Sequence, residues 1–100
     1  MSETSDITAP LLKALRKAGV MAHRMQSGKV KVRGGWMSLC EQGTADILCF
    51  PSRKPPTWLE TKVASGKASE SQTDFADRVR SMGHRHFVVR SVEEGLDAVL

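Results

Sequence analysis

Long hydrophobic runs are missing from this sequence of 100 residues, because no stretch approaches the roughly 18 apolar residues that a membrane-spanning helix needs. The first residues also lack a basic segment leading into an apolar one, so we expect no secretory signal. Internal repeats and low-complexity segments are absent, and 40% apolar with 26% charged residues is the composition of a folded chain. We therefore expect one soluble domain over residues 1–100, with no membrane partner.

Cysteine is scarce as well. Cys40 and Cys49 are the only two, and neither has the spacing of a zinc ligand or of a Cys-x-x-Cys motif. Both stand in apolar surroundings, which predicts two reduced thiols in the core. Such thiols are typical of a reducing compartment, so we expect a cytoplasmic protein.

Acidic residues are fewer than basic ones: 11 Asp and Glu against 15 Lys and Arg give a net charge of +4, which suggests a polyanionic partner. The segment 29–33 alternates Lys and Arg with Val, and glycine-containing turns flank it, so it predicts a basic ribbon. This ribbon either follows DNA phosphates or is a solvated strand face. The candidate DNA-binding residues are Arg24, Lys29, Lys31, Arg33 and, from a later loop, Lys67.

The spacing of apolar residues predicts three helices. The first covers residues 7–18, with Thr8 as its N-cap and Pro10 in its first turn. The second follows the capping box Ser69-x-x-Gln72, and a short third helix follows Ser91. The apolar stripe of the second helix consists of Phe75, Val79 and Met82.

Alternating and continuous apolar runs predict strands within residues 20–40 and over residues 45–50, 57–63 and 85–90. A proline-rich turn joins the second and third of these segments, so they are expected to pair as a hairpin. The predicted order is α-β-β-β-α-β-α. This order indicates an α/β fold in which a mixed β-sheet is flanked by helices.

Three charged residues stand in or beside the strands of this hairpin. Glu60 and Lys62 are two residues apart and so project from one face of their strand. If the hairpin turns about Arg53, Asp46 lies opposite Glu60, and two carboxylates and an ammonium converge. Two acids brought together repel without a cation, and oxygen ligands suit Mg²⁺ or Mn²⁺ rather than Zn²⁺. Lys62 could then orient or deprotonate a water that attacks a phosphate.

A plainer interpretation is that Glu60 and Lys62 form an exposed strand face. Asp46 favours the site, since Asp is disfavoured in strands and here precedes four consecutive apolar residues. Gln72 favours it too, because it lies on the stripe of its helix that faces the sheet. Its alternative role, as the third residue of the capping box, stays open.

Several short motifs occur in a specific order. They are Gly43-x-x-Asp46-Ile47-Leu48, Glu60-x-Lys62, Gly66-Lys67-x-Ser69-x-x-Gln72, Gly83 and Val89-x-Ser91-x-Glu93-Glu94. Together they resemble the virus-type replication-repair nuclease (VRR-NUC) domain of the PD-(D/E)XK nuclease superfamily. The resemblance implies a restriction-endonuclease-like fold. Within the family the chain resembles the stand-alone members encoded by phages, which would act in the host-cell cytoplasm.

The resemblance also implies Mg²⁺- or Mn²⁺-dependent hydrolysis of DNA phosphodiester bonds, in DNA repair. The catalytic residues that it implies are Asp46, Glu60, Lys62 and Gln72, with Asp46, Glu60 and the backbone carbonyl of Thr61 as metal ligands. Family members often carry a further acidic residue in the first helix. Here Thr4 takes that position, and Glu3 is favoured over Asp6 as its replacement.

Stand-alone members are similar to junction-resolving homodimers, since one site cuts one strand and a four-way (Holliday) junction needs two symmetric cuts. Trp36, Met37 and Leu39 form a candidate dimer contact, or else belong to the core. A flap or duplex nuclease and a non-catalytic nucleic-acid-binding module on the same fold are the alternatives. The presence of both carboxylates and of Lys62 favours a nuclease.

Overall fold

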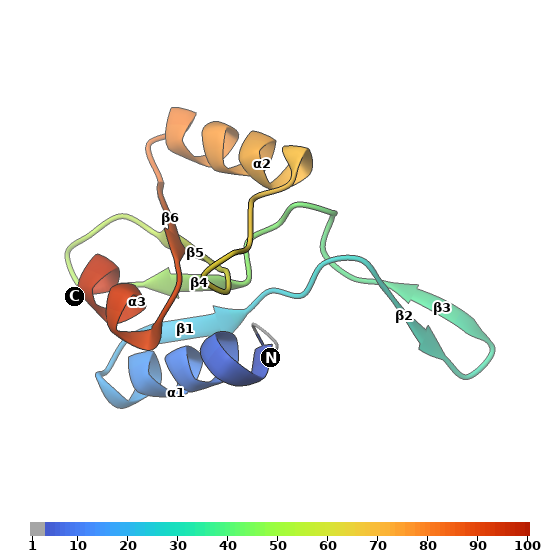
Figure 1. Cartoon of the computed structure of the whole chain (residues 1–100), viewed down its shortest axis with the longest axis horizontal. Coiled ribbons are helices and arrows are strands. Elements are labelled where there is room, and N and C mark those ends of the chain that lie inside the picture. Colours follow the sequence, from blue (N-terminus) through green and yellow to red (C-terminus); the bar gives the residue numbers. More distant parts are fainter. Residues whose placement is uncertain (1–3) are drawn as a thin grey trace.

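The computed structural model describes residues 4–100, and a four-stranded mixed sheet lies at its centre (Figure 1). Its strands, in spatial order, are β1 (Met21–Arg24), β4 (Ile47–Phe50), β5 (Thr57–Thr61) and β6 (Arg85–Val89). β1 pairs with β4 and β4 with β5 in antiparallel fashion, whereas β5 and β6 run parallel. The predicted mixed sheet is confirmed.

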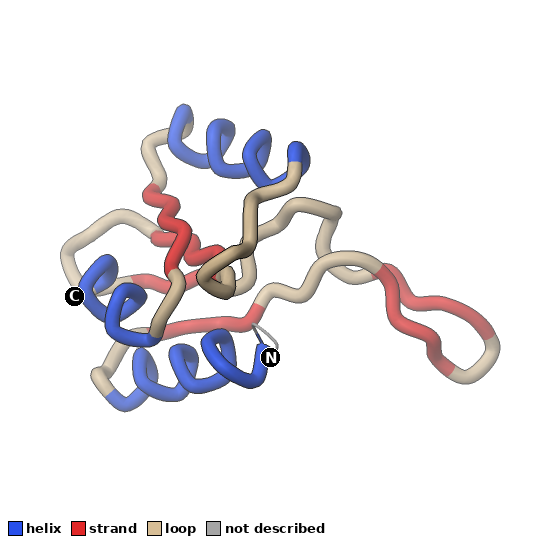
Figure 2. The backbone as a smooth tube through the Cα atoms, in the orientation of Figure 1, coloured by secondary structure: helices blue, strands red, loops and turns tan. Residues whose placement is uncertain are grey.

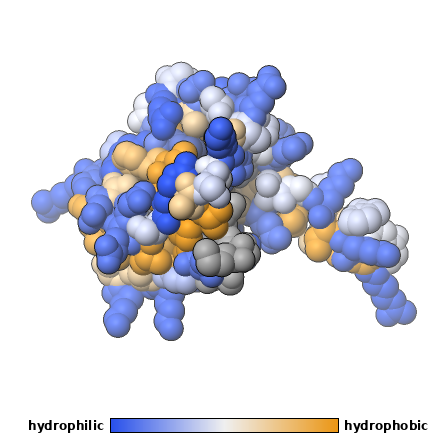
Figure 3. Space-filling model, viewed as in Figure 1, coloured by the Kyte–Doolittle hydropathy of each residue, from blue (hydrophilic) through white to orange (hydrophobic). Residues whose placement is uncertain are grey.

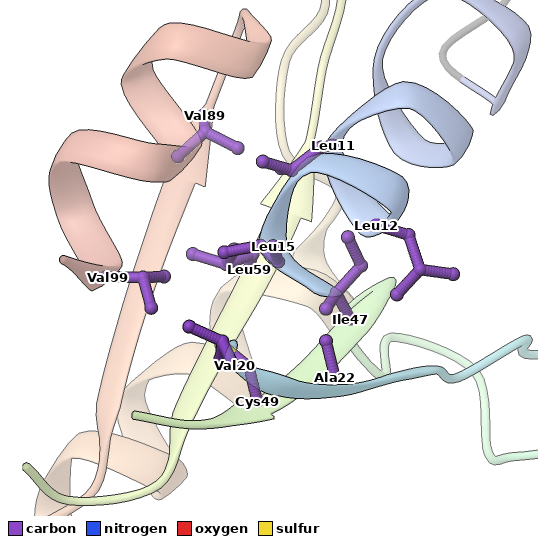
Figure 4. Packing of buried hydrophobic residues seen from close by; sticks show 10 residues of the cluster. All are labelled: Leu11, Leu12, Leu15, Val20, Ala22, Ile47, Cys49, Leu59, Val89 and Val99. Carbon is purple, nitrogen blue, oxygen red and sulfur yellow. The ribbon is translucent and has the colours of Figure 1, made fainter. Parts of the chain in front are cut away.

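Helices cover both faces of this sheet. α1 (Ala9–Lys17) and α3 (Val92–Val99) pack together on one face, and α2 (Glu70–Ser81) lies on the other, against β6 (Figure 1). The main core lies between α1, α3 and the sheet (Figure 4). It consists of Leu11, Leu12, Leu15, Val20, Ala22, Ile47, Cys49, Leu59, Val89 and Val99. No helix of the described residues is long and apolar enough to span a membrane.

The first helix begins earlier than the sequence indicates. A π-helical segment, η1 (Thr4–Thr8), runs directly into α1, so Thr8 has helical dihedral angles and makes no side-chain cap. The prediction of Thr8 as N-cap is therefore wrong. Pro10 does lie in the first turn of α1, where a proline is tolerated. The hydroxyl of Thr8 lies instead 2.6 Å from that of Thr61 in β5.

The hairpin of β4 and β5 has the predicted register. Ile47 lies opposite Leu59, and the ladder, extended by one residue, brings Asp46 opposite Glu60. Arg53, at the centre of the hairpin, has a φ of 61°. This left-handed conformation is the one that tight turns require and that few side chains adopt. The turn at Arg53 therefore fixes the register on which the site depends.

α2 begins at the predicted capping box. The side-chain oxygen of Ser69 accepts from the N–H of Gln72 (3.2 Å), and Oε1 of Gln72 accepts from the N–H of Ser69 (2.9 Å). The helix contacts the sheet through Phe75, whose ring packs edge-on against Trp58 at a centroid distance of 5.0 Å. The sequence thus correctly predicts both where α2 begins and that Phe75 contacts the sheet.

A two-stranded ribbon, β2 (Lys29–Val32) and β3 (Gly35–Ser38), is inserted between β1 and β4 and protrudes from the body (Figure 2). We call residues 29–38 the arm. Every residue of its two strands is exposed, so the arm contributes nothing to the core. The predicted basic ribbon is confirmed.

Some residues predicted for the core lie at the surface. Trp36 and Met37, on the arm, are 68% and 49% exposed, so their interpretation as core residues is wrong. Met82 is 64% exposed because it follows the last turn of α2, and its predicted burial is wrong too. Cys49 is buried as predicted, whereas Cys40 is only half-buried beside the base of the arm.

Gly43 allows the loop before β4 to approach α2 closely. Its φ is +94°, and a Cβ at this position would lie 2.4 Å from the backbone carbonyl oxygen of Ser71. We therefore expect Gly43→Ala to lower the free energy of unfolding by roughly 1–3 kcal/mol in urea titrations. Gly34→Ala is the control, because Gly34 also has a positive φ, +90°, but open space around it. Equal losses in the two variants would contradict the close-approach argument.

Candidate active site

The two predicted carboxylates stand on strand ends at one edge of the sheet. Asp46 immediately precedes β4 and Glu60 stands near the end of β5, and the antiparallel register places these strand ends side by side. The arm leaves from the same edge, since the N–H of Met25 donates to the carbonyl of Asp46 (2.7 Å). Carboxylates and arm therefore lie at one end of the molecule.

The carboxylate of Asp46 is fixed by Thr61. Its Oδ2 accepts the N–H of Thr61 (2.8 Å) and the hydroxyl of Thr61 (2.9 Å). Because that hydroxyl gives its only proton to the carboxylate, the Thr8 hydroxyl must donate to it. Charge-assisted bonds of this kind are short and directional. The carboxylate is thus held in one orientation and connected to the first helix.

The side chain of Glu60 is buried beneath α2. It is 3% exposed, and its Oε2 accepts a hydrogen bond from Nε2 of Gln72 (3.2 Å). The interpretation of Glu60 as part of an exposed strand face is therefore wrong. Gln72 uses one end of its amide in the capping box and the other on Glu60, so the two roles proposed for it coexist.

Lys62 is half-buried at the start of the loop that joins β5 to α2. Its N–H donates to the carbonyl of Val89 (3.0 Å), which extends the parallel ladder by one bond. Its side chain lies along Gly66, where an added Cβ would be 3.3 Å from Cδ of Lys62. The backbone at Gly66 therefore confines the direction in which the ammonium can extend.

Arg90, which the sequence does not single out, holds this loop. Its Nη1 donates to the carbonyls of Val63 (2.7 Å) and Gly66 (2.8 Å), on either side of the turn that follows Lys62. No local motif identifies such a residue, because its partners lie more than 20 residues away in the chain. Arg90 therefore bridges the two sides of the turn that follows Lys62.

A second unpredicted residue, His86, lies under α2 and lines a cavity together with Glu60. This cavity has a volume of about 120 Å³, and Gln72 lines it too. Burial, and after it the charge of Arg80, lowers the pKa of His86 from 6.5 to about 4. Among the described residues, its Nδ1 has no hydrogen-bond partner. His86 is therefore uncharged at physiological pH, where it lines the cavity beside Glu60.

The donor set fits a hard divalent cation. In the part of the chain that the structure describes, no three His, Cys, Asp or Glu side chains gather into a metal cluster. Two carboxylates, Asp46 and Glu60, are nevertheless what Mg²⁺ usually takes from a protein, with waters and substrate phosphates completing its coordination. Asp6 is exposed in η1, and Glu3 lies outside the described residues.

The predicted DNA-binding residues all have exposed side chains. Lys29, Lys31 and Arg33 lie on the arm, Arg24 ends β1 just before it, and Lys67 lies in the loop before α2. The arm and the β5–α2 loop both leave the sheet at the carboxylate edge. The cations therefore approach the site from two segments of the chain.

Comparison with known proteins gives one clear result. No protein-family model matches this chain, and no curated protein matches it either. A solved structure described as a VRR_NUC domain does match, with a TM-score of 0.62 and 22% sequence identity over 90% of this chain and 87% of that one. The chain therefore has the fold of a VRR-NUC domain, and the fold implied by the motifs is confirmed.

The buried His86 makes stability depend on pH. The unfolded chain binds a proton at this histidine near pH 6.5, whereas the folded chain resists it down to about pH 4. The stabilisation that comes from keeping His86 neutral is therefore fully present above pH 6.5. As the pH decreases from there towards about pH 4, the free energy of unfolding should fall by roughly 1 kcal/mol per pH unit.

Urea unfolding of wild type, His86→Gln and His84→Gln at pH 7, 6 and 5 measures this effect. We expect His86→Gln to flatten the slope and His84→Gln, an exposed neighbour, to keep it. A wild-type slope in His86→Gln would show that the histidine does not resist protonation.

Proposed function

We propose that this protein is a metal-dependent DNA endonuclease. The observation that carries the proposal is the position of Asp46 and Glu60 on neighbouring strand ends, each held by a hydrogen-bond donor from another part of the chain. Two carboxylates on neighbouring strand ends, beside a ribbon of exposed cations, suit a site that takes up a divalent ion and a phosphate.

Each residue has a separate task in this proposal. Asp46, Glu60 and the backbone carbonyl of Thr61 would hold Mg²⁺ or Mn²⁺. The ion would lower the pKa of a water and offset the charge of the scissile phosphate. Lys62 would position that water or receive its proton. Gln72 orients Glu60, and Thr61 orients Asp46, as the hydrogen bonds described above support.

DNA binding is assigned to the exposed cations. Lys29, Lys31 and Arg33 on the arm, with Arg24 and Lys67, would contact phosphates. Such contacts carry little sequence information but place the substrate in register with the site. Branched DNA suits this arrangement, because a protruding arm and a loop on the body can contact different limbs of one substrate.

Glu60→Gln tests catalysis. The amide keeps the shape of the side chain but removes the charge that would hold the cation, so cleavage of labelled DNA in Mg²⁺ or Mn²⁺ should fall by roughly 100-fold or more. DNA affinity, measured by fluorescence anisotropy in EDTA, should stay within about twofold of wild type.

Glu93→Gln is the matched control, an exposed carboxylate at the start of α3 that should cleave as wild type does. Wild-type cleavage of DNA by Glu60→Gln would contradict the assignment of Glu60 to the catalytic site. A wild-type protein that binds DNA through the arm but never cuts it would be a non-catalytic binding module on the same fold.

We further propose a homodimer that resolves four-way junctions. One chain carries one carboxylate pair, and two symmetric cuts need two sites. The arm has a partly exposed apolar face: Val30, Val32 and Met37 are 37%, 40% and 49% exposed. A second copy would bury this face, which so small a domain cannot cover by itself.

Light scattering at micromolar concentration should therefore give about twice the chain mass of 11.0 kDa. Junction DNA should be cut in preference to linear duplex, because only the junction presents two equivalent scissile phosphates. A protein that stays monomeric both alone and on junction DNA would leave a nuclease but exclude the resolving homodimer.

A further inference from the structure

The two faces of the arm differ in chemistry. Lys31 lies directly opposite Trp36, and Val30 lies directly opposite Met37. Because directly paired residues share a face and neighbours along a strand alternate, Lys29, Lys31 and Trp36 lie on one face. The valines and Met37 lie on the other. The arm is therefore cationic and aromatic on one side and apolar on the other, and Figure 3 shows it as a protrusion that carries hydrophilic and hydrophobic atoms side by side.

Trp36 is the more exposed of the two tryptophans. It is 68% exposed, and among the described residues its ring makes no aromatic contact. Trp58, in contrast, is half-buried against Phe75. A large indole held in solvent beside two lysines is not a folding feature. Aromatic rings interleaved with cations are typical of surfaces that bind single-stranded nucleic acid, where bases stack on the rings and phosphates meet the cations.

We propose that Trp36 stacks on an unpaired base at a branch point or single-stranded end, while Lys29 and Lys31 contact the flanking phosphates. Bases within a duplex already stack on both sides and offer only their edges, whereas a base at a branch or in a single strand offers a free face. Trp36 would thus make the arm recognise unpaired bases. This inference rests on the proposed function, in which DNA is the substrate, and it names the unpaired base as the part of the DNA that the arm recognises.

A second copy of the chain fits this face poorly. Two such faces brought together by symmetry would oppose Lys29 and Lys31 to the same lysines, and like charges repel. The apolar face with Val30 and Met37 suits a protein contact better. In this proposal the apolar face of the arm contacts the second copy of the chain, and the Trp36 face contacts DNA.

The position of the arm also sets where the DNA would be cut. Lys31, the cross-strand partner of Trp36, is six residues along the chain from Met25, whose N–H donates to the backbone carbonyl of Asp46. At no more than about 3.4 Å per residue along the strand and about 5 Å across to the paired strand, the Cα of Trp36 lies at most about 25 Å from that point. With bases spaced about 3.4 Å apart and the indole extending beyond its Cα, the cut should fall within roughly ten nucleotides of the unpaired base.

The test is binding in EDTA, where no cleavage occurs. Trp36→Ala should lose affinity for forked or single-stranded DNA by roughly 5- to 100-fold, the range that loss of one base stacking partner produces. Affinity for blunt duplex should change less than twofold. Forked DNA should quench the tryptophan emission of wild type, and Trp36→Ala should lack this quenching although it retains Trp58.

Two further variants separate stacking from apolar burial. Trp36→Phe keeps an aromatic face and should retain most of the preference for unpaired bases, whereas Trp36→Leu keeps an apolar side chain and should lose it. Met82→Ala, at a similarly exposed residue just after α2, is the control and should bind as wild type does.

An equal loss on duplex and forked DNA would overturn the inference, as would Trp36→Leu binding like wild type. Either result would leave the nuclease proposal in place, since cleavage is measured separately in Glu60→Gln. A wild-type protein that binds no DNA in EDTA would overturn this inference and the DNA-binding role of the arm together.

Discussion

The antiparallel pairing of β4 with β5 is the constraint on which the rest of the structure depends. A shift of one residue in this register would move Glu60 from the α2 face of the sheet to the α1 face and separate it from Asp46. The left-handed turn at Arg53 and the apolar pairs between the strands exclude such a shift. Once the register is set, both residues stand at one edge of the sheet, and Glu60 lies within hydrogen-bond reach of α2.

Helices on both sides then fix the two carboxylates. From the α1 face, Thr8 contacts Thr61, which holds Asp46; from the α2 face, Gln72 holds Glu60. Each carboxylate is therefore oriented by an element that also forms the fold. Placing side chains on rigid elements with supporting hydrogen bonds limits their motion, which the proposed metal site would need.

The sequence predicts the carboxylate pair because both clues are local: a period of two along a strand and a turn that centres the hairpin. It also predicts the capping box from four adjacent residues.

The sequence does not reveal the contact of Thr8 with Thr61, which spans 53 residues, or the loop held by Arg90, because neither residue departs from its local pattern. Burial of His86 is hidden for a similar reason, since a single histidine in a strand can face solvent or a helix. The sequence does not decide whether Trp36 is buried or at the surface, because alternating apolar residues occur both in a core strand and in a ribbon that packs against nothing.

The most direct measurement is anomalous diffraction from crystals of the protein soaked in Mn²⁺, together with crystals of Asp46→Asn treated in the same way. The account predicts an anomalous peak in contact with the carboxylates of both Asp46 and Glu60 in the wild type and its loss in the variant. Manganese bound elsewhere, with no peak between these two carboxylates at saturating concentration, would contradict it.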